Sequence, residues 1–552
     1  DEVWGFDENG TVTNSQTEET WKPVITQYKG ASYGTMINVS PTFPQAAKQL
    51  LVKNLTIEDI TIGGGIGYIS NIFSVSSEGN LTLGEGTIIQ NVTGGAYSTN
   101  GYVLSSRGNV TIDGAFIRKV DVNSNQDGRT SEGELITILG GTLTFLDGVI
   151  EDSIVRLYVN SEKNAASMIG IMSGGSFFMK GGRIENNSVV SSSGHQYGAA
   201  TALIEIDQNS TMEWSGGVIS NNKVRGHNYG DATGVIIVIG SGTKFIMEGG
   251  NLENNIIDQK DGTMPKSALI MIGSDAVISG GTISGNTTTA NKGQAIGKYS
   301  PVYIDSPNFK LKGGSANITD AIYLADTDSL ITLSGQIYQK DRIYTVYLNQ
   351  TGTEAFGPGS AVVQPDNNWL SDATPYLGNF NVISAPYILD QGQSEQAVGN
   401  GNTALQENQC LILMKAVFID SEKGYDQYDG ASPDHAVKTF EQAKKVGQTD
   451  GQETNGHYVI YASGPVRVSG EAADAPISWT LPETAYLCRY TGFTVYDKNG
   501  VPVSGTGEGG KGYTGELIEL GSGANLVLGG EDGGTIHIYG RRGIDSDTYN
   551  GD

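Results

Sequence analysis

The chain has 552 residues, of which 78 are glycine and only 17% are charged. Short runs rich in β-branched and aromatic residues recur along its length, which excludes a wholly disordered protein. The 60 acidic and 34 basic residues give a net charge of −26. Such a field repels phosphate backbones, so we expect no nucleic-acid partner. Two cysteines, Cys410 and Cys488, are too few for a disulfide framework.

No uninterrupted apolar run reaches about 18 residues, so we expect no direct membrane insertion. The first residues, Asp1 to Gly5, do not have the pattern of a signal peptide, and the last four residues do not form an anchor. We therefore interpret the chain as an excerpt of a longer protein that is secreted or held at a cell surface.

Residues 1–50 are expected to form an N-terminal cap and the first strands, and an internal repeat occupies residues 51–342. Its clearest copies have the pattern Gly-Gly-Xaa-Ile/Leu-Xaa-Xaa/Gly-Asn. They begin 35, 33 and 31 residues apart, at Gly181, Gly216, Gly249 and Gly280. A fixed period of this length is typical of a solenoid.

Each repeat is predicted to contain three short strands, illustrated by residues 203–207, 211–214 and 218–220. Alternation directs five large side chains to one side: Ile204, Ile206, Met212, Trp214 and Ile219. We expect Ile204 to stack with Ile169, Ile237 and Ile270 at the strand spacing of about 4.8 Å. The predicted fold is all-β, a parallel β-helix.

Asparagine ends the repeat pattern at several positions. An inward asparagine at a turn can hydrogen-bond both the backbone and its equivalents in adjacent coils. We therefore predict a structural ladder of Asn91, Asn187, Asn222, Asn255 and Asn286. The alternative is that some of these residues are glycosylation acceptors, as in Asn91-Val92-Thr93.

The Gly-Gly-Xaa-Ile-Xaa-Xaa-Asn units, within about residues 51–340, resemble the right-handed parallel β-helix repeats of large surface proteins from Gram-positive gut bacteria. Those repeats belong to the broad pectate-lyase-like superfamily. The resemblance implies the fold but no particular activity, because such helices include adhesins, passive stalks, polysaccharide lyases and glycoside hydrolases.

The repeat fades after residue 342. Four prolines interrupt residues 343–414, which we expect to form a C-terminal cap and linker. A second β-helix-like domain is predicted over residues 415–552, with strands at 517–520 and 535–538. Ser432-Pro433 indicates the start of a capping helix at 433–446, as the resemblance to pectate-lyase-like domains also implies.

Two nearly identical segments provide the candidate binding residues. Gly194-His195-Gln196-Tyr197-Gly198 and Gly226-His227-Asn228-Tyr229-Gly230 lie 32 residues apart, in loops that should leave the solenoid on one side. A ladder of His195, Tyr197, His227 and Tyr229, with Arg225 beside it, suits a sugar ring or a protein partner. Alternatively, the segments are ordinary copies of one repeat loop. The His pair lacks a convincing third metal ligand.

Two carboxylates interrupt an uncharged face of the first strands. Glu205 and Asp207 are separated by about 6.7 Å of strand rise, close to the ~6.5–9.5 Å spacing of an inverting glycosidase pair. They could equally be surface carboxylates of an acidic chain. An apolar column on the same face is either covered by loops or forms an interaction groove; it consists of Leu135, Met168, Leu203, Ile236 and Leu269.

No organic cofactor is indicated. Asp420, Asp426 and Asp429 provide hard oxygen ligands for a candidate calcium site, although their spacing differs from the calcium-binding loop pattern. Lyase chemistry in the superfamily usually needs Arg or Lys beside Ca²⁺-binding acids. Arg183 and Arg225 are present, but no acidic cluster aligns with them.

The favoured hypothesis is a non-enzymatic extracellular module of a bacterial surface protein. Its loops, around residues 188–200 and 222–233, would bind a host glycan, a mucin-type glycoprotein or an immunoglobulin. The alternatives are a glycoside hydrolase using Glu205 and Asp207, less favourably a polysaccharide lyase, and a passive spacer.

Overall fold

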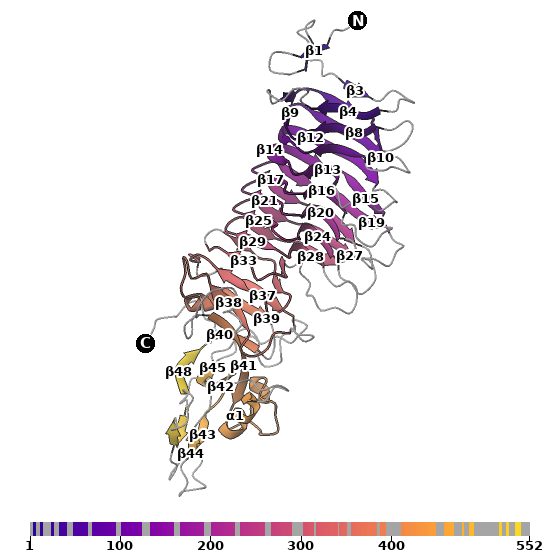
Figure 1. Cartoon of the computed structure of the whole chain (residues 1–552). Helices are drawn as coiled ribbons and strands as arrows, with labels where there is room; N and C mark the ends of the chain where they lie inside the picture. Colours follow the sequence, from indigo (N-terminus) through magenta and orange to yellow (C-terminus); the bar gives the residue numbers. More distant parts are fainter. Residues whose placement is uncertain are drawn as a thin grey trace. The chain divides into compact units, whose positions relative to one another are not determined.

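The structure is a computed structural model of the chain (Figure 1). It describes residues 4–6, 12–14, 24–26, 33–40, 48–63, 69–94, 101–123, 133–158, 166–192, 200–226, 232–259, 267–289, 302–313, 316–339, 342–349, 355–383, 387–392, 410–448, 458–468, 477–479, 485–490, 518–520, 526–528 and 536–542. The chain divides into two compact units, Asp1–Ile322 and Tyr323–Asp552.

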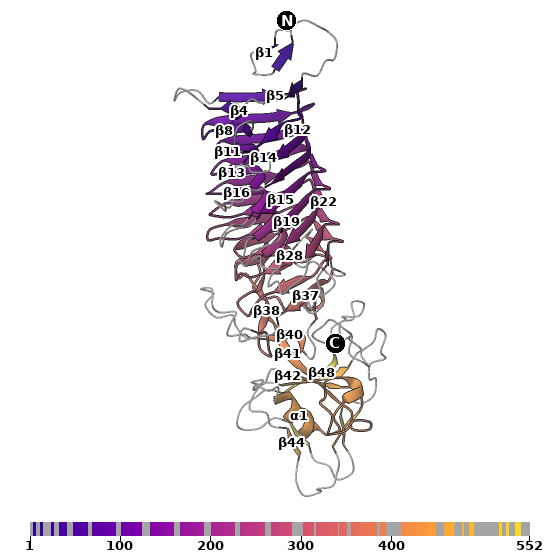
Figure 2. The same cartoon turned by 90° about the vertical axis from the view of Figure 1, so that its right-hand side faces the viewer.

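The first unit is a parallel β-solenoid of about eight coils. Figure 2 shows its first stack of strands in order from β4 through β8, β11 and β13 to β16. That stack comprises β4 (Tyr33–Val39), β8 (Ile69–Val75), β11 (Tyr102–Ser106), β13 (Gly133–Leu139), β16 (Ala166–Met172), β20 (Ala200–Ile206), β24 (Ala232–Val238), β28 (Ser267–Ile272) and β32 (Val302–Ile304). The second comprises β5 (Lys48–Val52), β9 (Gly79–Gly84), β12 (Asn109–Asn123), β14 (Thr142–Glu151), β17 (Ser176–Met179), β21 (Thr211–Trp214), β25 (Lys244–Met247), β29 (Asp275–Ile278) and β33 (Phe309–Leu311).

Two further stacks complete the coils. The third comprises β3 (Val24–Thr26), β6 (Thr56–Glu58), β10 (Ile88–Gly94), parts of β12 and β14, β18 (Arg183–Glu185), β22 (Val218–Ser220), β26 (Asn251–Glu253), β30 (Thr282–Ser284) and β34 (Asn317–Ile318). The fourth comprises β7 (Thr61–Ile62), the ends of β10 and β12, β15 (Ile154–Tyr158), β19 (Ser188–Ser192), β23 (Lys223–Gly226), β27 (Ile256–Gln259) and β31 (Thr287–Thr289). Near the N-terminus, β1 (Trp4–Phe6) and β2 (Val12–Asn14) pair antiparallel.

The central coils thus contain four strands, where we predicted three. The additional strand follows the asparagine turn, in residues that the sequence analysis assigned to loops. It pairs in parallel from coil to coil. The copies in the central coils each bury one apolar residue, Val189, Val224 or Ile257, which helps to stabilise the strand there.

The core contains the predicted aliphatic columns with one error of register. Ile204, Ile206, Met212, Trp214 and Ile219 are all fully buried. Ile204 pairs with Ile236, however, and not with the predicted Ile237. Five consecutive apolar positions at 235–239 provide no alternation from which the register could be read.

The glycine pairs mark turns where neighbouring backbones approach closely, as predicted. Gly217 has a φ of +86°. A Cβ atom at Gly216 would lie 2.4 Å from the carbonyl oxygen of Lys180 in the preceding coil. A side chain at either position would disturb the stacking of coils.

The second unit begins with shorter parallel pairs. β36 (Ile331–Leu333) pairs with β38 (Ala361–Pro365), and β37 (Tyr344–Leu348) pairs with β39 (Phe380–Ile383). A 3₁₀ helix, η1 (Thr374–Asn379), precedes β39, and β35 (Ile322–Leu324) lies at the boundary between the units.

One long strand, β41 (Cys410–Ile419), organises this unit. It pairs antiparallel with β38 and with β40 (Tyr387–Gly392), and parallel with β42 (Tyr458–Ala462). All ten residues of β41 are buried. The predicted boundary at 414/415 falls inside this strand, so the cap and the following domain are one packed unit.

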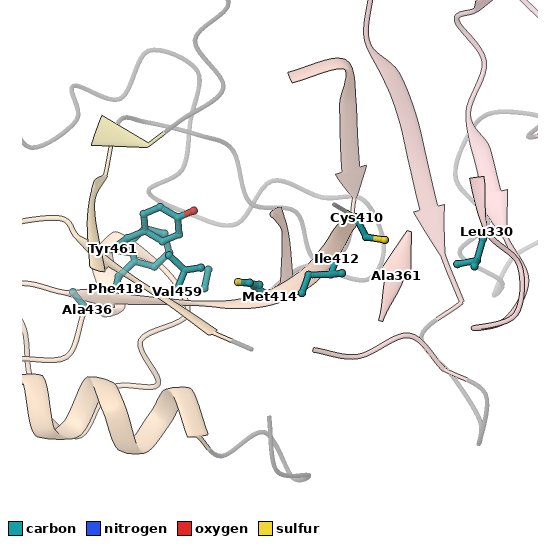
Figure 3. Packing of buried hydrophobic residues seen from close by; sticks show 10 residues of the cluster. Leu330, Ala361, Cys410, Ile412, Met414, Phe418, Ala436, Val459 and Tyr461 are labelled. Atoms are coloured by element: carbon teal, nitrogen blue, oxygen red, sulfur yellow. The ribbon is translucent and has the colours of Figure 1, made fainter. Parts of the chain in front are cut away.

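The two faces of β41 contribute to different clusters. Cys410, Ile412, Met414 and Phe418 pack with Leu330, Ala361 and Tyr461 (Figure 3). Val417 and Ile419 pack against Phe440 and Ala443. Cys410 is a free, buried thiol, and its burial and the nearby Asp372 raise its pKa to about 12.

The predicted helix at 433–446 is replaced by two shorter elements. Pro433–His435 forms the 3₁₀ helix η3, and the α-helix α1 spans Phe440–Gln448. Val437 forms a parallel bridge with Ile419, which interrupts a continuous helix. Thr439 caps α1, because its hydroxyl oxygen accepts a 3.3 Å hydrogen bond from the backbone nitrogen of Gln442.

The remaining strands form further parallel pairs, with β45 (Ala485–Tyr490) and β48 (Ile536–Arg542) stacked beyond β42. β43 (Val466–Val468) pairs with β46 (Ile518–Leu520), and β44 (Ile477–Trp479) with β47 (Leu526–Leu528). Both segments expected to be strands, 517–520 and 535–538, contain one. Within the described ranges, no helix is both long and apolar enough to span a membrane.

Candidate functional site

The strands on either side of the two predicted binding loops are stacked in register. β19 pairs with β23, and β20 pairs with β24. The chain between β19 and β20 therefore starts and ends directly above the chain between β23 and β24. His195, Tyr197, His227 and Tyr229 belong to these two connections and lie outside the described residues.

Arg225, the remaining predicted binding residue, lies on the surface of the fourth stack. Its Nε is 2.9 Å from Oδ2 of Asp258 in the next coil. Lys223 Nζ reaches the same oxygen at 3.0 Å. Two cations therefore share one carboxylate.

Glu205 is buried where the sequence analysis expected a surface carboxylate. Its exposed fraction is 0%. Within the described part of the chain, neither carboxyl oxygen makes a well-formed hydrogen bond. Burial, followed by the charge of Asp207, raises the pKa of Glu205 to about 8, and the Ser167 hydroxyl offsets this only in part.

Asp207 is half-buried, and its Oδ1 accepts a 2.6 Å hydrogen bond from the backbone nitrogen of Gln208. Burial raises the pKa of Asp207, and that bond opposes the shift. Because Glu205 has no solvent-accessible surface, this conformation presents one carboxylate of the pair to a substrate, where an inverting glycosidase needs two.

The neighbouring apolar column is also buried. Leu135, Met168, Leu203, Ile236 and Leu269 are each 0% exposed, which rules out an open groove along them. The one-residue register error also moves Ile236 out of this column: Ile236 pairs with Ile204, and Ile237 pairs with Glu205.

Four asparagines form a continuous row of hydrogen bonds. The Oδ1 of Asn222 accepts from the backbone nitrogen and the Nδ2 of Asn187, at 3.0 and 3.1 Å. Asn255 and Asn286 accept from the preceding asparagine in the same way. Each Nδ2 also donates to a backbone carbonyl in the preceding coil. We call Asn187, Asn222, Asn255 and Asn286 the asparagine ladder.

Two residues that the sequence analysis missed terminate the ladder. At one end, Ser153 donates its backbone N–H to Asn187 Oδ1 at 3.1 Å, and its hydroxyl accepts from Val120. At the other end, Asp320 Oδ2 accepts from Nδ2 and the backbone nitrogen of Asn286. A row of one-way donors needs a final acceptor, and a carboxylate provides it.

Asn91 does not belong to the ladder. Asn91 is exposed and has a left-handed backbone conformation with a φ of +55°, and the same is true of Asn221. The ladder position of that coil is the next residue, Val92, which is fully buried. The misassignment arose because the repeat has two adjacent turn positions, and in several coils both are asparagine.

The three aspartates of the candidate calcium site each accept hydrogen bonds from different backbone N–H groups. Asp420 Oδ1 accepts from the backbone nitrogens of Glu422 and Lys423, each at 2.9 Å. Asp426 accepts from the backbone of Lys438 and Thr439, and Asp429 from that of Ala431. Among the described residues, no group of three or more His, Cys, Asp or Glu side chains could hold a metal. Their arrangement supports structural roles in turns.

Comparison with models of known protein families, with curated proteins and with solved structures finds no match in any of the three. The resemblance noted from the repeats is therefore supported for the parallel β-solenoid alone.

Proposed function

We propose that the chain is a non-enzymatic binding module of an extracellular bacterial surface protein. In this proposal the solenoid is a scaffold, and the connections between the fourth and first strands bind a host glycan or glycoprotein. The observation that carries the proposal is the in-register pairing of β19 with β23 and of β20 with β24. It gives two nearly identical His- and Tyr-containing segments equivalent attachment points.

A scaffold of this kind suits an extended or repetitive ligand. Backbone ladders fix successive coils at about 4.8 Å, so equivalent loops recur at a constant pitch. Several weak contacts made at once raise the overall affinity without requiring a deep pocket. Mucin-type glycans and immunoglobulins are the partners that we propose to test.

The buried position of Glu205 favours binding over glycoside hydrolysis. A general acid must reach the glycosidic oxygen within hydrogen-bonding distance, and Glu205 has no exposed surface in this conformation.

The test is incubation of the chain with gut mucin and secretory immunoglobulin, followed by mass spectrometry of both the retained material and any released sugar. We expect a retained partner without released sugar. Sugar release that disappears in Glu205→Gln or Asp207→Asn would overturn the proposal. If neither partner is retained and no sugar is released, the proposal also fails and the spacer alternative is preferred.

A further inference from the structure

The second unit exposes a cluster of three rings between β41 and α1. Tyr425 and Tyr428 are 53% and 42% exposed. Their ring centroids lie 5.7 Å apart at 61°, and His435 stacks on Tyr428 at 5.2 Å and 22°. Isolated exposed aromatic residues are common, whereas rings gathered at one place indicate an interaction surface.

The backbone that carries these rings is held by its own hydrogen bonds. Tyr425 donates its N–H to the carbonyl oxygen of Ala436 at 2.9 Å, and Tyr428 donates to that of Tyr425 at 2.9 Å. Between the two tyrosines, the Asp426 carboxylate accepts hydrogen bonds from the backbone nitrogens of Lys438 and Thr439, which ties this segment to the start of α1. Because the rings are pre-positioned, binding a ligand orders little that was mobile before.

The charge around the rings selects the ligand. Residues 420–439 contain five carboxylates and two lysines, a net charge of −3 with His435 neutral. Asp429 contacts one of the rings: its Oδ1 is 3.5 Å from Nδ1 of His435, and its side chain is 67% exposed. The negative face of an aromatic ring attracts cations, and the surrounding acids add to that attraction.

We propose that Tyr425, Tyr428 and His435, together with Asp429, form a docking site for a lysine-rich segment of a partner protein. A lysine ammonium group would lie against the tyrosine rings and pair with the Asp429 carboxylate. This goes beyond the loop-mediated binding proposed above, because it concerns another unit of the chain and another chemistry. Either proposal can fail without the other.

The probe is a fluorescently labelled hexalysine peptide with blocked ends, titrated with the full chain at low ionic strength. We expect the Tyr425→Leu/Tyr428→Leu variant to bind about tenfold more weakly than the wild type. Adding Asp429→Asn to this variant should weaken binding further. Tyr338→Leu removes a ring that is 75% exposed elsewhere in the same unit and should leave the affinity unchanged. Hexalysine acetylated on its side chains should not bind.

Equal affinity of the wild type and the double tyrosine variant would overturn the proposal, because general attraction to a chain of charge −26 would then explain the binding. Absence of wild-type binding would overturn it as well. Unfolding midpoints of all variants serve as the folding control. They should match the wild type, since the replaced rings are exposed and the segment is held through its backbone.

Discussion

The asparagine ladder and the Glu205 position lie in the same coils and are equally buried, yet their polar groups are in opposite situations. The side-chain amides of Asn187, Asn222 and Asn255 each find an acceptor in the next coil, because the repeat places another asparagine there. Glu205 is flanked in its stack by Gly170 and Ile237, neither of which has a polar side chain. In the asparagine ladder, repetition supplies a partner for every buried polar group, so these groups are stabilising. In the column of Glu205, the adjacent coils supply no polar partner, so the buried carboxylate is destabilising.

Interrupting the ladder at its centre should have the largest effect. Asn222→Leu removes five hydrogen bonds. The buried backbone N–H of Asn187 then loses its acceptor, and Asn187 Nδ2 keeps only its bond to the carbonyl oxygen of Ile150. We expect a loss of about 5 kcal/mol in the free energy of unfolding, measured by denaturant titration. The adjacent Asn221→Gly is the control. Because Asn221 has a φ of +55°, glycine fits there and stability should change little. Similar losses in both variants would show that the ladder contributes nothing special.

Neutralising Glu205 should have an effect that depends on pH. The folded carboxyl group keeps its proton up to about pH 8, whereas the unfolded one releases it near its ordinary pKa. Wild-type stability therefore falls as the pH rises from about 4.5 to 8. Glu205→Gln should be no less stable at the low end of this interval and more stable by on the order of 4 kcal/mol above it.

The matched control for that experiment is Glu213→Gln, which changes an exposed side chain on the adjacent β21. It should alter stability little at any pH. A pH-independent difference between wild type and Glu205→Gln would contradict the buried, poorly solvated environment assigned to Glu205.

Removing the terminal acceptor of the ladder should have an intermediate effect. Asp320→Leu removes two hydrogen bonds, one from the backbone nitrogen and one from Nδ2 of Asn286, for an expected loss of about 2 kcal/mol. Asp320→Asn keeps an oxygen at that position and should lose less. If calorimetry finds the leucine variant as stable as the asparagine variant, Asp320 does not terminate the ladder as described.

The exposed ion pair of Arg225 should matter least. Its side chain is 39% exposed, and Lys223 shares the same Asp258 carboxylate. Arg225→Met should lower stability by no more than about 0.5 kcal/mol, and less at high salt. A loss as large as that expected for Asp320→Leu would mean that exposure is a poor guide to the contribution of polar contacts in this solenoid.

Much of the fold was predictable from the sequence because the repeat exposes its own period. The pairs Gly216-Gly217 and Asn221-Asn222 mark two turns of each coil, and alternation between them locates the strands. The fourth strand was missed because copies such as β23 (Lys223–Gly226) and β31 (Thr287–Thr289) contain too few apolar residues for alternation to be recognised. The Ile236 register was missed because its apolar run has no polar marker.

The candidate sites were less predictable, because side-chain chemistry depends on what covers a residue. Alternation placed Glu205 on the face opposite Ile204, but both faces of β20 are buried. The aspartates of 420–429 have the composition of a metal site, yet local backbone N–H groups engage each of them. Only coordinates could distinguish these situations, since the residue types are the same in both.

The most direct test of the proposed function is the equilibrium affinity of the His195→Ala/Tyr197→Ala/His227→Ala/Tyr229→Ala variant for the partner retained by the wild type, measured by biolayer interferometry. If stacked loops form the binding surface, the variant should bind at least about tenfold more weakly while its unfolding midpoint stays the same. Unchanged affinity in a folded variant would contradict the assignment of binding to these loops.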